Sequence, residues 1–143
     1  MKCQTIIDKS REEEVIIYVH EKSELSEEIE SLVLGTSTEL IGYSDKLAIK
    51  INLSEIFCIV VEDSKVYVMT ENEKLRMKQR LYVLEEMLGN DFVKINQSCI
   101  VNIRKIERFD ASFAGALSVT LKNGHKDYVS RRQLKTVKER VGL

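Results

Sequence analysis

Residues 91–106 read Asp-Phe-Val-Lys-Ile-Asn-Gln-Ser-Cys-Ile-Val-Asn-Ile-Arg-Lys-Ile. The apolar residues on either side predict two short strands, at 92–95 and 98–103, joined by a polar insertion. Asn96 and Gln97 in that insertion are poor strand formers and favour a turn or a strand edge. Their amides are also the side-chain groups that bond adenine bidentately in the major groove of DNA. An ordinary polar turn is the alternative interpretation.

The residues after this stretch predict a hairpin and a final helix. Alternating apolar and polar residues over 117–121 precede Asn123-Gly124, the strongest short hairpin signal, because both positions of such a turn need positive φ. A last helix is expected over 131–141, with Ser130 and Gln133 as a capping box.

The residues before the stretch predict more short strands and one helix. Apolar residues at 77, 81, 84 and 88 share one helical face, and Gly89 ends the helix. Four strands are expected before the stretch, at 39–43, 46–51, 56–61 and 66–70. The two strands of the hairpin after it are expected at 116–122 and 125–129. The fold class that follows is α+β, predominantly β.

The first 44 residues differ from the rest in composition. Segments 3–9 and 14–20 predict two strands, and a helix capped by Ser23 or Ser26 is expected to follow and to end at Gly35. We therefore divide the chain into a small acidic strand–strand–helix unit at 1–44 and a β-rich domain at 45–143. The first unit buries little surface alone, so we interpret it as a dimerisation or regulatory element.

The net charge of −1 conceals an uneven distribution. Residues 1–44 carry 4 basic and 10 acidic groups, whereas residues 92–143 carry 11 basic and 4 acidic groups. Such asymmetry favours an anionic partner for the C-terminal part. A basic surface that faces only solvent is the alternative.

Several classes of protein are disfavoured by the composition of the 143-residue chain. The sequence contains no apolar run of about 18 residues, so no membrane span is predicted. The start of the sequence shows no secretory signal. Three widely spaced cysteines favour a reducing cytoplasm over a disulfide scaffold. His20 and His125 lie in distant segments, Cys99 lies in an apolar run, and no catalytic motif is present. We therefore expect no enzyme activity, no cofactor and no metal ion.

Two further segments break local rules. Arg131 and Arg132 fall in the expected opening turn of the last helix, where they oppose the helix dipole. An anion such as phosphate would explain them, because free backbone N–H groups and guanidinium groups would meet it together. Lys65 and Tyr67 follow a predicted tight turn at Asp63-Ser64, which by itself indicates only a hairpin end.

Residues 91–106, together with Leu121 to Gly124 and Tyr128 to Arg132, resemble the LytTR DNA-binding domain. The resemblance covers about residues 45–143. It implies an elongated, mostly β domain that places loops in successive major grooves. It also implies DNA contacts from the segments Lys65 to Tyr67 and Lys94 to Ser98 and from Arg132, and a structural role for Asn102. Many members carry Arg-x-His where this chain has Lys94, Ile95 and Asn96, so the preferred bases are expected to differ.

The leading hypothesis is a bacterial, cytoplasmic transcriptional regulator that binds specific double-stranded DNA. The candidate DNA-binding residues are Lys65, Tyr67, Lys94, Asn96, Gln97, Ser98, Arg131 and Arg132. The arginines would grip phosphate or guanine, Asn96 and Gln97 would read base edges, and the lysines and the tyrosine would set the register on the backbone. A homodimer or paired copies on repeated sites are expected, and the family resemblance adds a membrane-protein regulator by analogy.

The alternative is a protein-interaction module. Its acidic unit at 1–44 would bind a regulatory partner, and its DNA binding would be weak or absent.

Overall fold

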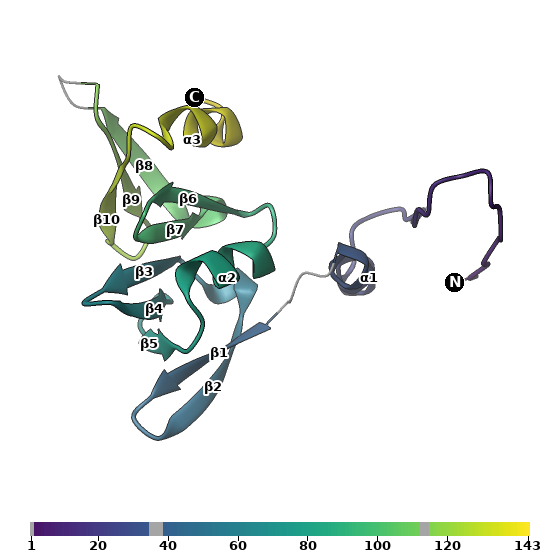
Figure 1. Cartoon of the computed structure of the whole chain (residues 1–143), viewed down its shortest axis with the longest axis horizontal. Helices are drawn as coiled ribbons and strands as arrows, with labels where there is room; N and C mark the ends of the chain where they lie inside the picture. The colour runs from purple at the N-terminus through teal and green to yellow at the C-terminus, as the bar shows by residue number, and fades with distance from the viewer. Residues whose placement is uncertain (1, 35–38, 112–114) are drawn as a thin grey trace.

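The computed structural model describes residues 2–34, 39–111 and 115–143, and most of its regular structure is strand (Figure 1). Among these residues, ten strands form two antiparallel sheets, which three α-helices accompany. The predicted fold class, α+β and predominantly β, is confirmed.

The larger sheet has the strand order β2-β1-β5-β4-β3-β7-β6, and the smaller sheet has the order β10-β9-β8. The strands of the larger sheet are β1 (Glu39–Ser44), β2 (Leu47–Asn52), β3 (Cys58–Glu62), β4 (Lys65–Met69), β5 (Lys74–Met77), β6 (Phe92–Asn96) and β7 (Cys99–Asn102). The smaller sheet contains β8 (Ile106–Ala111), β9 (Leu117–Leu121) and β10 (Lys126–Val129). The helices are α1 (Glu24–Leu34), α2 (Leu81–Met87) and α3 (Leu134–Val141), and short 3-10 helices follow β2 (Leu53–Glu55) and β7 (Ile103–Lys105).

The core has two parts because β3 is buried on both faces. Ile59 belongs to a cluster that includes Leu84 of α2, whereas its neighbours Cys58 and Val60 belong to a second cluster. Successive side chains of a strand point to opposite faces, so the two clusters lie on opposite sides of the larger sheet. The second cluster also contains residues of β9 and α3, including Val137. The larger sheet is therefore the middle layer, with α2 on one face and the smaller sheet and α3 on the other.

The eight strands predicted from residue 39 onward are all present, with shifts of one or two residues at their ends. The strands β5 and β8 were not predicted. Met77, which was assigned to a helix, ends β5, and α2 begins only at Leu81. The side chains of β5 are alternately exposed and buried, so its polar–apolar alternation outweighs the helical spacing. The side chains of β8 show no such alternation, which left that strand without a signal.

The turn predicted at Asn123-Gly124 joins β9 to β10, but it is of a different type. Only Gly124 has positive φ, at 89°. Its N–H donates to the Leu121 carbonyl (2.9 Å), and the Leu121 N–H donates to the His125 carbonyl (2.8 Å), so the loop has three residues. The turn with two positive φ values is that between β3 and β4, where Asp63 and Ser64 have φ of 49° and 62°.

The N-terminal segment differs from the prediction in its strands and in where the larger sheet begins. Segments 3–9 and 14–20 form no strands, and nearly all their side chains are exposed, because no neighbouring strand pairs with them. The predicted helix is present as α1, and Ser23 and Ser26 cap it reciprocally through backbone N–H to hydroxyl bonds of 3.0 and 3.3 Å. The larger sheet begins at Glu39, within the segment that we assigned to the acidic unit, because β1 pairs with β2 and β5. Figure 1 shows α1 and the preceding chain apart from the two sheets.

Candidate nucleic-acid interface

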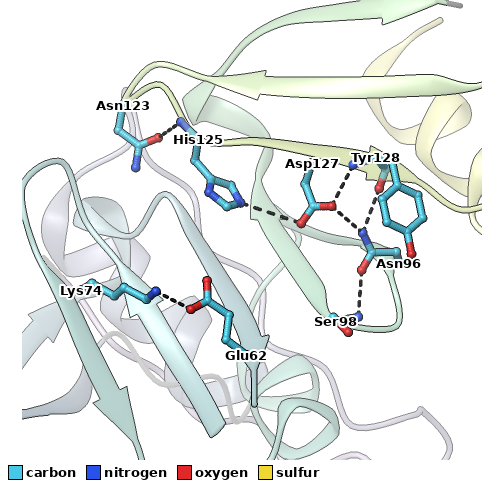
Figure 2. Close-up of polar contacts among 8 residues, drawn as sticks. All are labelled: Glu62, Lys74, Asn96, Ser98, Asn123, His125, Asp127 and Tyr128. Carbon is cyan, nitrogen blue, oxygen red and sulfur yellow. Dashed lines mark hydrogen bonds and ion pairs between the residues drawn. The ribbon is translucent and has the colours of Figure 1, made fainter. Parts of the chain in front are cut away.

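The turn between β6 and β7 is built around Asn96, whose side chain is buried at 1% exposure. Its Oδ1 accepts a hydrogen bond from the backbone N–H of Ser98 (2.8 Å) and so fixes the turn. Its Nδ2 donates to Asp127 Oδ1 (3.1 Å) and to the Tyr128 carbonyl (2.9 Å) (Figure 2). Asn96 was expected to read base edges, but this structure turns its amide inward to hold the turn against β10. Gln97 and Ser98 are exposed at the tip.

Two backbone hydrogen bonds bring the predicted segments together. The Ser98 carbonyl accepts from the Val61 N–H (2.8 Å), which places the β6–β7 turn beside the end of the β3–β4 hairpin. The Ile95 carbonyl accepts from the Ser130 N–H (2.8 Å), which places β6 beside the residues that follow β10. The segments around Lys65, Gln97 and Arg131, far apart in sequence, are therefore neighbours in the fold.

The two arginines lie in a turn before α3 and not in its first turn. Arg131 and Arg132 are both exposed, and neither forms an ion pair with another described residue. The predicted capping box is wrong, because Gln133 is the N-cap and makes no side-chain capping bond. The Gln133 N–H instead donates to the Ser130 carbonyl (3.0 Å) and closes the turn. Both guanidinium groups are thus available to a ligand near the start of α3.

Lys65 and Lys94 differ in their surroundings. Lys65 is exposed and lies opposite Glu62 across the β3–β4 turn. Lys94 is half-buried, and its Nζ lies 3.8 Å from the Glu85 carboxylate of α2. Of the two, Lys65 offers its charge to solvent, whereas part of the Lys94 charge is already compensated within the protein.

Tyr67 organises two cations that the sequence did not single out. Its half-buried side chain packs against the second core cluster. Lys74 Nζ and Arg76 Cζ lie 4.9 and 5.8 Å from the centre of its ring, within cation–π range. Both cations belong to β5, whose alternating Lys-Leu-Arg-Met pattern was the available signal. Lys74 Nζ also forms an ion pair with Glu62 Oε2 at 2.5 Å, whereas Arg76 forms no ion pair with a described residue.

A titratable pair lies beneath the β6–β7 turn, at the start of β10. His125 Nε2 lies 3.8 Å from Asp127 Oδ2, which is an ion-pair distance and not a hydrogen-bond distance. The Asp127 carboxylate raises the pKa of His125 above its ordinary value, although burial acts in the opposite direction. Burial alone would raise the pKa of Asp127, but contacts with His125, the Tyr128 N–H and Asn96 lower it below its ordinary value.

Two buried thiols lie next to this pair. Cys58 of β3 and Cys99 of β7 are both free and fully buried. The neighbouring Cys58 and burial raise the pKa of the Cys99 thiol. Sequence reasoning assigned Cys99 to the core, which is confirmed, but gave no sign that His125 and Asp127 would lie beside it.

Asn102, which was expected to be structural, has that role. Its Nδ2 donates to the buried Ile56 carbonyl (2.9 Å), and its Oδ1 accepts from the Arg104 N–H (3.0 Å). Among the described residues, no helix is long and apolar enough to cross a membrane.

Comparison with known proteins identifies relatives of the whole chain and of its domain. Residues 46–142 match the family model of the LytTr DNA-binding domain, a description that names no enzyme class. Proteins from Staphylococcus aureus strains MSSA476 and NCTC 8325, both named uncharacterized HTH-type transcriptional regulators, are 34% identical over 100% of this chain and 99% of their own lengths. Although that name says HTH-type, strands separate the helices along the described part of this chain.

A solved structure has the same fold. The LytTr DNA-binding domain of a protein described as a methyl-accepting/DNA response regulator from Bacillus cereus aligns with a TM-score of 0.71 and 20% identity. The alignment covers 75% of this chain and 99% of that domain. The family match extends over more than half of the chain, and the curated relatives extend over all of it. The chain therefore belongs to the LytTR DNA-binding domain family.

Proposed function

We propose that this protein is a transcriptional regulator that binds specific double-stranded DNA with loops placed in the major groove. The family supports DNA binding in general. The observation that carries the finer proposal is the bonding of the β6–β7 turn, which contacts Val61 on one side and adjoins the Ser130 segment on the other. Two turns of the larger sheet and the segment after β10 thus lie side by side and form a surface of the kind on which binding residues concentrate.

Each candidate residue has a proposed role that its surroundings support. Arg131 and Arg132 present exposed guanidinium groups, which pair with no carboxylate of the described residues, for phosphate or for guanine O6 and N7. Gln97 is the amide exposed at the tip of the β6–β7 turn and is our candidate for base reading, with Ser98 beside it. Asn96 becomes a positioning residue because its amide is used within the protein.

The remaining candidates would contact the DNA backbone. Lys65 offers an exposed ammonium group, and Lys94 a partly compensated one. Tyr67 would hold Arg76 over its ring as a further cation. Such contacts fix register and orientation and carry little sequence information.

Fluorescence anisotropy tests the proposal with DNA from upstream of the protein's own gene and a scrambled duplex of equal length. We expect tighter binding to the upstream DNA, and affinity that falls steeply with salt because several phosphates are neutralised. Equal, weak binding to both duplexes that disappears near physiological salt would count against a specific regulator with this operator.

Substitution of Arg132 locates the contact. If the residue reads a base, Arg132→Ala should cost about 1–3 kcal/mol of binding free energy and relax specificity at one position. The matched control is Arg104→Ala, because Arg104 is exposed, pairs with Asp91 and lies at the other end of the β6–β7 hairpin. Unchanged affinity and sequence preference in Arg132→Ala would remove Arg132 from the interface.

A second role is favoured for the acidic segment 1–44 by its exposed apolar side chains. Ile7, Tyr18 and Leu32 are 87%, 91% and 84% exposed. Large apolar side chains exposed in one segment are typical of a protein-binding surface. We infer that this segment binds protein, either a second copy of the chain or a regulatory partner, while the β-rich domain at 45–143 binds DNA.

Deletion of residues 2–34 separates the two roles, because it leaves β1 and the rest of the larger sheet intact. Circular dichroism first establishes that the shortened chain is folded. Loss of DNA binding in the folded, shortened chain would assign the segment to a dimer that binds paired sites. Retained DNA affinity with loss of a protein partner would assign it to regulation. A regulator of this kind would act in the bacterial cytoplasm, where the chromosome lies.

A further inference from the structure

A cluster of metal-ligating side chains lies where the two sheets meet. Cys99 of β7 belongs to the larger sheet, and His125 and Asp127 lie at the start of β10 in the smaller sheet. One donor atom from each of the three residues lies within 4.8 Å of the others. The buried thiol of Cys58 lies beside Cys99. None of these four residues is among the candidate DNA contacts.

The donor atoms of His125 and Asp127 face one another (Figure 2). His125 Nε2 is buried and has no hydrogen-bond partner among the described residues. A buried polar atom of this kind needs a partner, because its desolvation is otherwise uncompensated. The nearest carboxylate oxygen described, Asp127 Oδ2, is 3.8 Å away, too far for a hydrogen bond but suitable for two ligands of one ion.

The surroundings orient the carboxylate of Asp127. Its Oδ1 accepts from Asn96 Nδ2 (3.1 Å) and from the Tyr128 N–H (2.8 Å). These bonds leave Oδ2 directed at His125. Outer hydrogen bonds that hold a ligating carboxylate in one orientation are a regular feature of metal sites.

We propose that Cys99 Sγ, His125 Nε2 and Asp127 Oδ2 bind a divalent transition-metal ion of the zinc class. Sulfur, imidazole nitrogen and carboxylate oxygen are the donors that Zn²⁺ takes in tetrahedral sites. Zinc–ligand bonds of about 2.0–2.3 Å put tetrahedral donors roughly 3.3–3.7 Å apart. The observed cluster therefore needs to contract by about 1.5 Å at most from its 4.8 Å limit. The fourth position would be taken by Cys58 or by water, and the Cys99 thiol would release its proton to solvent on binding.

The position of this site gives it a consequence for the fold. A bound ion would join β10 of the smaller sheet to β7 of the larger one. The same stretch of β10 holds the Asn96 turn and leads directly to Arg131 and Arg132. The metal would therefore stiffen the arrangement of the candidate DNA loops. The metal site itself does not depend on the proposed function, and only this consequence rests on it.

Cobalt binding to the full-length protein tests the proposal without DNA. The protein is reduced and freed of metal with a chelator, and Co²⁺ is added while the absorption spectrum is recorded. We expect a thiolate-to-cobalt charge-transfer band and the visible bands of tetrahedral Co²⁺, saturating at one ion per chain and displaced by Zn²⁺. Absence of the charge-transfer band at millimolar Co²⁺ would overturn the proposal.

Conservative variants identify the ligands. His125→Gln and Asp127→Asn approximately retain side-chain size and should each weaken Co²⁺ binding by at least about 100-fold. Removing a residue that only supports a metal ligand costs up to about 100-fold, and loss of a ligand itself should cost at least as much. The matched controls are His20→Gln and Cys3→Ser, because both residues are exposed in the N-terminal segment. A cobalt spectrum that persists in His125→Gln, or that disappears in Cys3→Ser, would contradict the assignment.

Thermal unfolding supplies a second readout, and it does not require a variant of the buried Cys99. Cys99 is fully buried, so Cys99→Ser can fail to fold for reasons unrelated to metal. His125 and Asp127 are partly exposed, and their variants, checked by circular dichroism, keep the test valid. Zn²⁺ should raise the unfolding temperature of the wild type and of both controls, because it binds the native state. An equal rise in His125→Gln would overturn the proposal.

Discussion

Segments 14–20 and 56–61 are both rich in β-branched residues, yet they take different structures. The second contains most of β3, an inner strand of the larger sheet, where Ile59 is fully buried. The first forms no strand, and Ile16 and Tyr18 remain 58% and 91% exposed. β3 has a paired strand on each side and a core cluster on each face. β propensity therefore reflects what surrounds the segment more than an intrinsic backbone preference.

The largest expected effect is at Ile59 on β3, an inner strand of the larger sheet. Ile59→Ala should reduce the free energy of unfolding by about 2–5 kcal/mol, because it leaves a cavity in a core that has little freedom to collapse. Urea unfolding monitored by circular dichroism measures the change. A loss below about 1 kcal/mol would mean that the core around β3 is loosely packed.

Gly42 tests how tightly β1 packs against its neighbours. A Cβ there would lie 2.7 Å from Ile51 Cδ1 and 2.7 Å from Leu75 Cβ. Gly42→Ala should therefore cost about 1–3 kcal/mol through overpacking, measured by thermal unfolding. The matched control is Gly89→Ala, because a Cβ at that position would meet no described atom within 4 Å beyond its own chain neighbours. Equal stability of the two variants would show that β1 moves away without cost.

Two asparagines with the same capping role provide a finer comparison. Asn52 and Asn102 each accept a backbone N–H bond at the start of a 3-10 helix, but only Asn102 also donates to the buried Ile56 carbonyl. Asn102→Ala should cost about 1–3 kcal/mol more than Asn52→Ala, because it leaves that carbonyl unsatisfied. Urea unfolding of both variants measures the difference. Equal losses would show that the carbonyl finds another partner.

The smallest effect is expected in the N-terminal segment. Ile16→Ala should change the free energy of unfolding of the isolated chain by no more than about 0.5 kcal/mol, because the side chain is already 58% exposed. The same substitution at Ile59 is its direct counterpart. A loss above about 1 kcal/mol, or a change in molecular mass by light scattering, would show that the segment packs against another chain.

The sequence predicted most of the β-rich domain because its signals are local. Alternating apolar residues and turn residues marked eight strands from residue 39 onward. The polar insertion after Ile95 was correctly read as a turn, and Asn102 as a structural residue. Two strands were not predicted. In β5, Met77 was assigned to a helix because of its spacing from the following leucines, and in β8 apolar and polar residues do not alternate.

Tertiary structure alone decided how the side chains at the candidate sites are used. The sequence suggested that the amide of Asn96 contacts DNA bases. In the structure it donates hydrogen bonds to Asp127 and to the Tyr128 carbonyl, because β10 lies beside the turn. Cys99, His125 and Asp127 have no recognisable metal-ligand spacing, and only the meeting of two sheets brings their donor atoms within 4.8 Å. Local patterns mark candidate strands, because successive side chains of a strand point to opposite faces. Contacts between distant strands depend on how the sheets pack, and no short-range pattern encodes that packing.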